Sequence, residues 1–326
     1  MIYFYCQSYQ AFNLALALNT DTDVSVITAS KNIISACEFL KVKYIEHKYF
    51  GITEMIRNKG EVDNEVNRLV SVIKNDELHY SHTQFAVFCF YLVKILKDNN
   101  GNTLFHDFEF LYSKPRIISI IKKNYVLTKL KQILLTYKYN LPIEVRMSTK
   151  NSFMISLNMD YIHKHCKYIF YDKDFYYDTT LKMFKNFKLD YPEIDNLFIA
   201  QTFFNKSFFK KDKIDSVLSI INSKIFSVKN HPKLGAHAGL ENCIVIPEFL
   251  PVEFFFKKVN RNVISIHSAS LITASKFDHI KTISIIDIIK TDDHFMEEVK
   301  QELVEKSDNK ILFPKTMFEL KSLLNV

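Results

Sequence analysis

The amino-acid sequence predicts an α/β protein with two doubly wound parallel sheets, Rossmann-like in type, facing a cleft. Short apolar segments alternate with helical patterns, and this alternation starts again after a turn-rich joint at 190–196. Such alternation is typical of parallel sheets covered by helices on both faces. The chain has 326 residues, enough for two domains of ordinary size. We expect domains over 1–190 and 191–326, with the last helix a candidate to return to the first domain.

In the first domain, short apolar segments alternate with helical patterns over the first 50 residues. Strands are expected at 2–6 and 23–28, and helices at 10–18, 30–40, 52–74 and 82–98. A short strand at 102–108 precedes a long basic helical region at 115–138. Between 143 and 180 the pattern indicates further short strands.

In the second domain, the same rhythm returns. Strands are expected at 197–202, 224–228, 243–247, 262–268 and 282–286. Helical patterns cover 211–223, 252–258, 269–275 and 293–306, and 316–326 has the spacing of an amphipathic helix. In sheets of this type, ligands bind beyond the carboxyl ends of the strands, so candidate site residues are sought there.

The composition indicates a globular protein of a reducing compartment. Apolar residues make up 48% of the chain and charged residues 24%, and neither a long apolar run nor a basic leader is found. The five cysteines are scattered, which favours free thiols. The net charge of +7 comes mostly from dispersed lysines. We interpret them as a solvated surface, with an anionic membrane surface as the second interpretation.

The first candidate site residue is His231, which follows the strand at 224–228. Pro232 fixes the backbone behind it, and Gly235 and Gly239, two of only five glycines, allow close approach of a ligand. An imidazole placed there could donate a hydrogen bond to an anionic group. The alternative is an ordinary loop histidine.

Two further motifs suit a nucleotide. Glu253 follows Pro251 at the start of a short helix, where a carboxylate could pair with ribose hydroxyls or a base amino group. Ser268 is a natural N-cap after a strand, and Ser268 and Ser270 could bind a phosphate together with the helix end. Ordinary capping is the alternative, and the chain has neither a Walker A loop nor a GxGxxG motif.

An acidic candidate lies in the first domain. The strand at 102–108 ends near Asp107, and either Asp107 or Glu109 could act as a general base if burial raised its pKa. A surface acid at a strand end is the alternative. His163, His165 and Cys166 have no second cluster to complete a tetrahedral site, so we expect no metal and no cofactor.

The order of these motifs resembles that of bacterial GT-B-fold sialyltransferases with a His-Pro motif, namely lipooligosaccharide sialyltransferases and capsule polysialyltransferases. That family carries Lys-x-His-Pro, Pro-x-Glu and a Ser-Ser or Ser-Thr pair, where this chain has KNHP, PVE and SAS. The opening YCQSYQAFNLALAL is similar to their first strand and helix. The family's two acids followed by glycine are here His106-Asp107-Phe108, and only Ser268 of the serine pair matches directly.

The resemblance implies a metal-independent inverting glycosyltransferase. It would move a sialic acid or related nonulosonic acid from a CMP-sugar to a hydroxyl of a cell-surface glycan, glycolipid or capsule acceptor. The first domain would be the acceptor side and the second would bind the CMP-sugar. The implied roles are base (Asp107, with Glu109 as fallback), donor-phosphate binding (His231, Ser268, Ser270), cytidine binding (Glu253, Pro251) and further cleft contacts (Ser8, Gln10, Lys229).

Two alternatives remain open. A CMP-Kdo or CMP-pseudaminic acid transferase would use the same phosphate and cytidine contacts. A noncatalytic basic protein that binds nucleic acid or a surface would instead use the helical segment 114–131. We favour the enzyme, without a nucleic-acid partner, in the cytoplasm and peripheral to the inner membrane.

Overall fold

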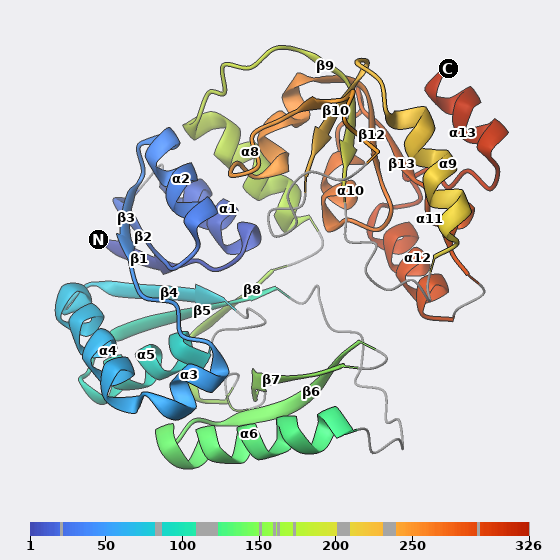
Figure 1. The fold of residues 1–326 in the computed structure, drawn as a ribbon. Coiled ribbons are helices and arrows are strands. Elements are labelled where there is room, and N and C mark those ends of the chain that lie inside the picture. Colours follow the sequence, from blue (N-terminus) through green and yellow to red (C-terminus); the bar gives the residue numbers. More distant parts are fainter. Residues whose placement is uncertain are drawn as a thin grey trace. The chain divides into compact units, whose positions relative to one another are not determined.

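The computed structural model (Figure 1) forms two compact units, Met1–Phe175 and Tyr176–Val326. The boundary lies at the start of helix α8 (Phe175–Asn186), before the turn-rich joint at 190–196. Tyr177 and Phe184 of this helix pack their rings against Phe277, which explains why α8 belongs to the second unit. The structure describes residues 1–19, 22–81, 87–108, 123–149, 152–158, 161, 164–171, 174–200, 209–230, 239–291 and 294–325.

The first unit is built on a six-stranded parallel sheet with the order β3-β2-β1-β4-β5-β8. Its strands are β1 (Ile2–Tyr5), β2 (Val24–Thr28), β3 (Lys43–Glu46), β4 (Glu77–Ser81), β5 (Asn102–Phe108) and β8 (Tyr168–Tyr171). Successive strands run outward from β1 to β3 and then resume on the other side of β1 with β4. This reversal defines a doubly wound sheet and confirms the predicted fold class.

Six helices of the first unit are described, and a β-hairpin lies beside the last of these helices. The helices are α1 (Tyr9–Leu18), α2 (Lys31–Leu40), α3 (Ile52–Arg57), α4 (Lys59–Ile73), α5 (Val87–Asp98) and α6 (Lys123–Tyr139). The antiparallel pair β6 (Ile143–Thr149) and β7 (Ser152–Leu157) forms a separate small sheet, and α6 runs along it (Figure 1).

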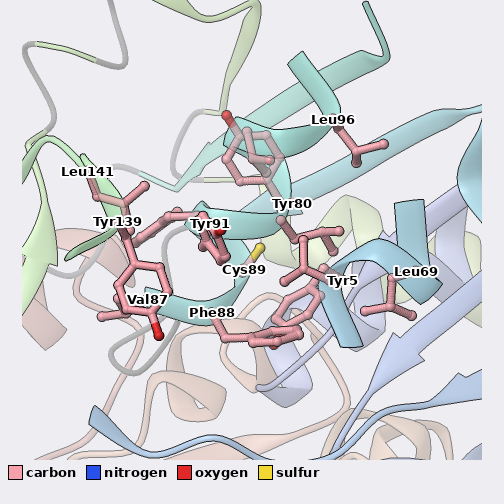
Figure 2. Packing of buried hydrophobic residues seen from close by; sticks show 14 of the residues in the cluster. Tyr5, Leu69, Tyr80, Val87, Phe88, Cys89, Tyr91, Leu96, Tyr139 and Leu141 are labelled. Atoms are coloured by element: carbon pink, nitrogen blue, oxygen red, sulfur yellow. The ribbon is translucent and has the colours of Figure 1, made fainter. Parts of the chain in front are cut away.

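One hydrophobic core of the first unit lies between the large sheet and helices α4 and α5. Tyr5 and Tyr80 point from adjacent strands to this face, where Phe88 and Leu69 pack from the helices (Figure 2). Phe105 of β5 belongs to the same cluster, with its ring centroid 5.2 Å from that of Tyr80. All five side chains are almost completely buried. Burial of a large apolar side chain contributes about 1.5–3 kcal/mol, so this cluster fixes the helices on the sheet.

The second unit repeats the arrangement with five parallel strands in the order β11-β10-β9-β12-β13. These are β9 (Ile194–Ile199), β10 (Phe226–Lys229), β11 (Ile244–Val245), β12 (Val259–Ser265) and β13 (Lys281–Ser284). The remaining elements are α9 (Lys211–Ile221), the 3-10 helix η2 (Val252–Lys258), α10 (Ala269–Ala274), α11 (Ile286–Ile289), α12 (His294–Lys306) and α13 (Met317–Leu324). Leu320 and Leu324 of the last helix pack in the core of this unit.

Candidate functional site

The sequence-predicted residues that the structure describes fall at the carboxyl side of the parallel strands. Ser8 follows β1, Asp107 lies near the end of β5, Lys229 ends β10 and Ser268 follows β12. In each unit the strand order reverses, between β1 and β4 and between β9 and β12. Ligands of open α/β sheets bind at such switch points, beyond the carboxyl ends of the strands. Ser8 and Ser268 both follow a strand that borders one.

In the second unit, the structure brings Glu253 and Ser270 together. The Ser270 hydroxyl donates a 2.8 Å hydrogen bond to Oε1 of Glu253, linking α10 to the first turn of η2. Ser268 is the N-cap of α10, and its hydroxyl oxygen accepts a 3.3 Å hydrogen bond from the Ser270 backbone N–H. Pro251 is the residue before η2, where its fixed φ suits the entry of the helix. Two motifs separated in sequence therefore form one polar cluster.

Lys229 and Asn230 bind the turn after β11. The Lys229 ammonium donates to the carbonyls of Pro247 at 3.0 Å and Glu248 at 2.6 Å. Asn230 Nδ2 donates to the Glu248 side chain at 2.9 Å. Lys229 is buried, and this burial lowers its pKa to about 8 although the nearby Glu248 and Glu253 carboxylates oppose the shift. Lys229 therefore holds the loop in place with its charged end while lying next to the Glu253 cluster.

His267 is a further residue of this region, which the sequence reasoning missed. It lies between the buried Ile266, which follows β12, and the N-cap Ser268. Desolvation by the surrounding protein lowers its pKa to about 4, so the imidazole is neutral at pH 7. The signal was available in the sequence, because His267 directly precedes the SAS motif at a strand end.

In the first unit, the candidate residues occupy two places. Asp107 is buried at the end of β5, opposite Phe170 of β8. Ser8 is the N-cap of α1, and its hydroxyl oxygen accepts a 3.3 Å hydrogen bond from the Ala11 N–H, while Gln10 lies in the first turn. Both places are at the carboxyl side of the sheet.

Several predicted residues lie outside the described part of the chain: His231, Pro232, Gly235, Glu109 and His163. Gly239 is described, and its φ of +89° is a conformation that favours glycine. Among the described residues, no group of three or more His, Cys, Asp or Glu side chains could hold a metal ion.

The Glu253 cluster can offer complementary hydrogen bonds to a ligand. A carboxylate accepts bonds from hydroxyl or amino groups, while serine hydroxyls and the first N–H groups of α10 can donate to an anion. The Lys229 ammonium donates to carbonyl oxygens of the protein. The groups of this cluster that can donate to an anion are therefore mainly the neutral hydroxyl and N–H dipoles. Such a set can bind a polar ligand that carries both hydroxyl or amino groups and an anionic group.

Two Rossmann-like units in one chain are characteristic of the GT-B class of fold. A Listeria monocytogenes protein assigned as a UDP-N-acetylglucosamine 2-epimerase is similar over 100% of this chain and 88% of its own, with 11% identity and a TM-score of 0.51. The glycotransferase of kitacinnamycin (8% identity, 99% and 89% covered, TM-score 0.48) and glycosyltransferase VinC (8%, 99% and 90%, 0.47) are also similar. No family model and no curated protein matches the sequence.

Proposed function

We propose that the protein is an inverting glycosyltransferase that moves a sialic acid, or a related nonulosonic acid, from a CMP-sugar to an acceptor hydroxyl. The observation that carries this proposal is the 2.8 Å hydrogen bond between Ser270 and Glu253 beside a strand end of the second sheet. It joins the two motifs that the sequence resemblance assigns to phosphate and cytidine. The Listeria protein of similar fold is named for a UDP-linked sugar, which agrees with a nucleotide-sugar donor.

The hydrogen bond suggests how the donor is bound. Ser270 directs its hydroxyl hydrogen to Glu253. Hydroxyl or amino groups of the cytidine moiety would replace this donor on the carboxylate. Ser270 would then be free to rotate its hydroxyl toward the phosphate, next to Ser268 and the α10 N–H groups. Binding of the nucleoside to Glu253 would free the Ser270 hydroxyl for the phosphate, and binding of the phosphate to Ser270 would free Glu253 for the nucleoside. The two parts of the donor would thus be recognised together.

Departure of CMP needs stabilisation of the charge that develops on one phosphate. Ser268, Ser270 and the backbone N–H groups of α10 would supply fixed dipoles, and His231 would add an imidazole donor. We expect this set to act without a metal ion. Pro251 would support the cytidine through the position it gives to Glu253.

The acceptor hydroxyl needs a base, and Asp107 is our assignment. Its carboxylate would take the proton while the acceptor oxygen attacks the anomeric carbon, the bond to CMP breaks, and configuration inverts. Glu109 is the alternative base. Asp107 belongs to the first unit and the Glu253 cluster to the second, so variants in each unit test separate steps.

A donor panel tests the proposal. CMP-sialic acid, CMP-Kdo, CMP-pseudaminic acid and UDP-N-acetylglucosamine would be offered with glycan acceptors, and CMP release, UDP release and epimerisation would be measured. CMP release with a nonulosonic acid donor is expected. Turnover of CMP-Kdo alone would show that the donor sugar is Kdo rather than sialic acid. Epimerisation of the UDP-sugar would show that the protein is an epimerase and not a transferase.

Binding of CMP tests the donor site directly. Calorimetry should show that Glu253→Gln and Ser270→Ala each weaken CMP by about 10-fold or more, since each removes a hydrogen bond to a charged group. Ser216→Ala is the matched control, because Ser216 is exposed on α9 and its hydroxyl donates to the Asp212 carbonyl within the same helix. Equal CMP affinity in all four proteins would remove this cluster from the donor site.

A further inference from the structure

Helix α6 is apolar on the side that faces away from its own unit. Leu135 and Tyr139 on its inner side are buried, and the Tyr139 hydroxyl donates to the Met55 carbonyl at 2.6 Å. Figure 1 shows the β6–β7 hairpin along one side of the helix. Six large apolar side chains are nevertheless exposed: Val126, Leu127, Leu130, Ile133, Leu134 and Tyr137.

The exposed apolar residues form one continuous stripe. Their spacing follows the turns of the helix, so at 3.6 residues per turn they fall within an arc of about 120° opposite Leu135 and Tyr139. The exposed fractions range from 48% for Val126 to 91% for Tyr137. Scattered exposed apolar residues are ordinary, whereas a contiguous stripe marks a binding surface.

Lysines border this apolar stripe. On the helical projection, Lys129 lies at one edge of the arc and Lys131 at the other. Lys138 lies near the second edge and donates to the Ile56 carbonyl, so its ammonium is held by the protein. The helix contains four lysines and no acidic residue. An apolar stripe between basic edges is the pattern of helices that lie in the interface of an anionic bilayer.

We propose that α6 docks the protein on an anionic lipid surface, with the Val126–Tyr137 stripe in the interface and Lys129 and Lys131 at the headgroups. A second copy of the chain is the competing occupant. Its α6 would bring the same lysines to both edges, so that like charges would face each other, whereas paired helices usually match opposite charges there. This inference does not depend on the proposed transferase activity. Among the described helices, none is long and apolar enough to cross a bilayer.

Vesicle sedimentation with the full-length chain tests the proposal. Binding is expected to vesicles of phosphatidylcholine with phosphatidylglycerol, to be weak with phosphatidylcholine alone, and to fall as salt rises. Leu130→Glu and the double variant Lys129→Gln/Lys131→Gln should each reduce binding about tenfold or more. Because these side chains are exposed or at the edge of the stripe, the variants should keep the far-ultraviolet spectrum and melting temperature of the wild type.

Matched controls come from the second unit. Phe318 on α13 is 82% exposed, and Lys211 and Lys213 on α9 are exposed. Phe318→Glu and Lys211→Gln/Lys213→Gln should bind vesicles as the wild type does. If all variants lose binding equally, the attraction is a property of net charge and the assignment to α6 is overturned. Absence of vesicle binding, together with a dimer that Leu130→Glu dissociates in analytical ultracentrifugation, would establish the second copy instead.

Discussion

The Nε2 atom of His106 lies 2.9 Å from the Nδ1 atom of His79, inside the sheet of the first unit. The pair is part of a longer chain of hydrogen bonds. Nε2 of His79 lies 3.0 Å from a Glu77 carboxylate oxygen, and Nδ1 of His106 lies 2.7 Å from the Tyr171 hydroxyl. Because the carboxylate can only accept, one proton arrangement of neutral imidazoles satisfies the chain: Tyr171 donates to His106, His106 to His79, and His79 to Glu77.

This network predicts a large effect of removing His106. The His106→Ala change would leave a cavity and remove one hydrogen-bond partner each from Tyr171 and His79, so we expect a loss of about 2–4 kcal/mol in the free energy of unfolding. Urea unfolding of the wild type and variant measures it. His165→Ala, at an exposed histidine, is the control and should change stability by less than about 0.5 kcal/mol. A similarly small loss for His106→Ala would mean that the network carries no net stability.

Buried histidines predict sensitivity to acid. Burial lowers the pKa of His106 to about 3, with His79 adding to the shift, and burial lowers the pKa of His47 to about 4. The unfolded chain takes up these protons below about pH 6.5 while the folded chain does not, so stability must fall as pH falls from 6.5 toward 4. Each histidine should contribute roughly 1.4 kcal/mol per pH unit in the steep part of this range.

Denaturant unfolding at pH 7.0, 5.5 and 4.5 checks this dependence. His47 stacks on Phe88 with ring centroids 4.9 Å apart, so His47→Phe should retain much of the packing while removing the titrating group. The variant is expected to have a shallower loss of stability with acid than the wild type. Parallel profiles for the two proteins would contradict the assignment.

The lowered pKa of Lys229 predicts that, at alkaline pH too, its contribution to the free energy of unfolding rises with pH. Its pKa of about 8 in the folded protein lies below the ordinary value of 10.5, because burial disfavours the charge. Between pH 8 and 10.5 the unfolded chain binds more protons at this residue, so its contribution to stability rises with pH. Buried thiols, whose pKa burial raises, act in the opposite direction. The difference between the wild type and Lys229→Met therefore isolates the lysine, and should grow in favour of the wild type from pH 8 to 10.

The base assignment predicts a separation of binding from turnover. Asp107→Asn should lower kcat by about 10²–10⁴-fold, because proton removal is lost, while CMP affinity stays unchanged. Initial rates with saturating donor and calorimetry with CMP make the two measurements. Glu109→Gln is the comparison, and near wild-type turnover is expected for it. The reverse result, with Asp107→Asn active and Glu109→Gln inactive, would move the base to Glu109.

The regular part of the fold could be predicted because apolar strands such as Ile2–Tyr5 stand out from their surroundings. Strands β3 and β4 could not be predicted from the sequence. β3 is an edge strand with charged residues at both ends, and β4 places Glu77 and His79 where a buried strand usually has apolar residues. The partners that make these polar residues acceptable come from β5 and β8, far along the chain. Helix α8 was missed because its sequence, FYYDTTLKMFKN, is rich in aromatic and β-branched residues.

The candidate site was predictable as a set of positions but not as a set of contacts. Strand ends gave the places of Ser268, Glu253 and Lys229, since parallel strands share one functional edge. The Ser270–Glu253 bond and the burial of Lys229 depend on how η2 and the turn at Pro247 return to the sheet. Sequence spacing does not encode that return path.

The strand orders have a consequence for how the chain acquires its structure. Within each large sheet, every pair of neighbouring strands is parallel and needs a crossover connection. Strand β1 can therefore pair with its second neighbouring strand, β4, only after the chain has been made as far as Glu77. Only the β6–β7 hairpin forms by local closure among the described sheets. Sheets of such high contact order gain their first native pairings slowly. During synthesis, strand β1 is therefore expected to leave the ribosome with one edge unpaired. At this stage a chaperone would be able to bind that edge.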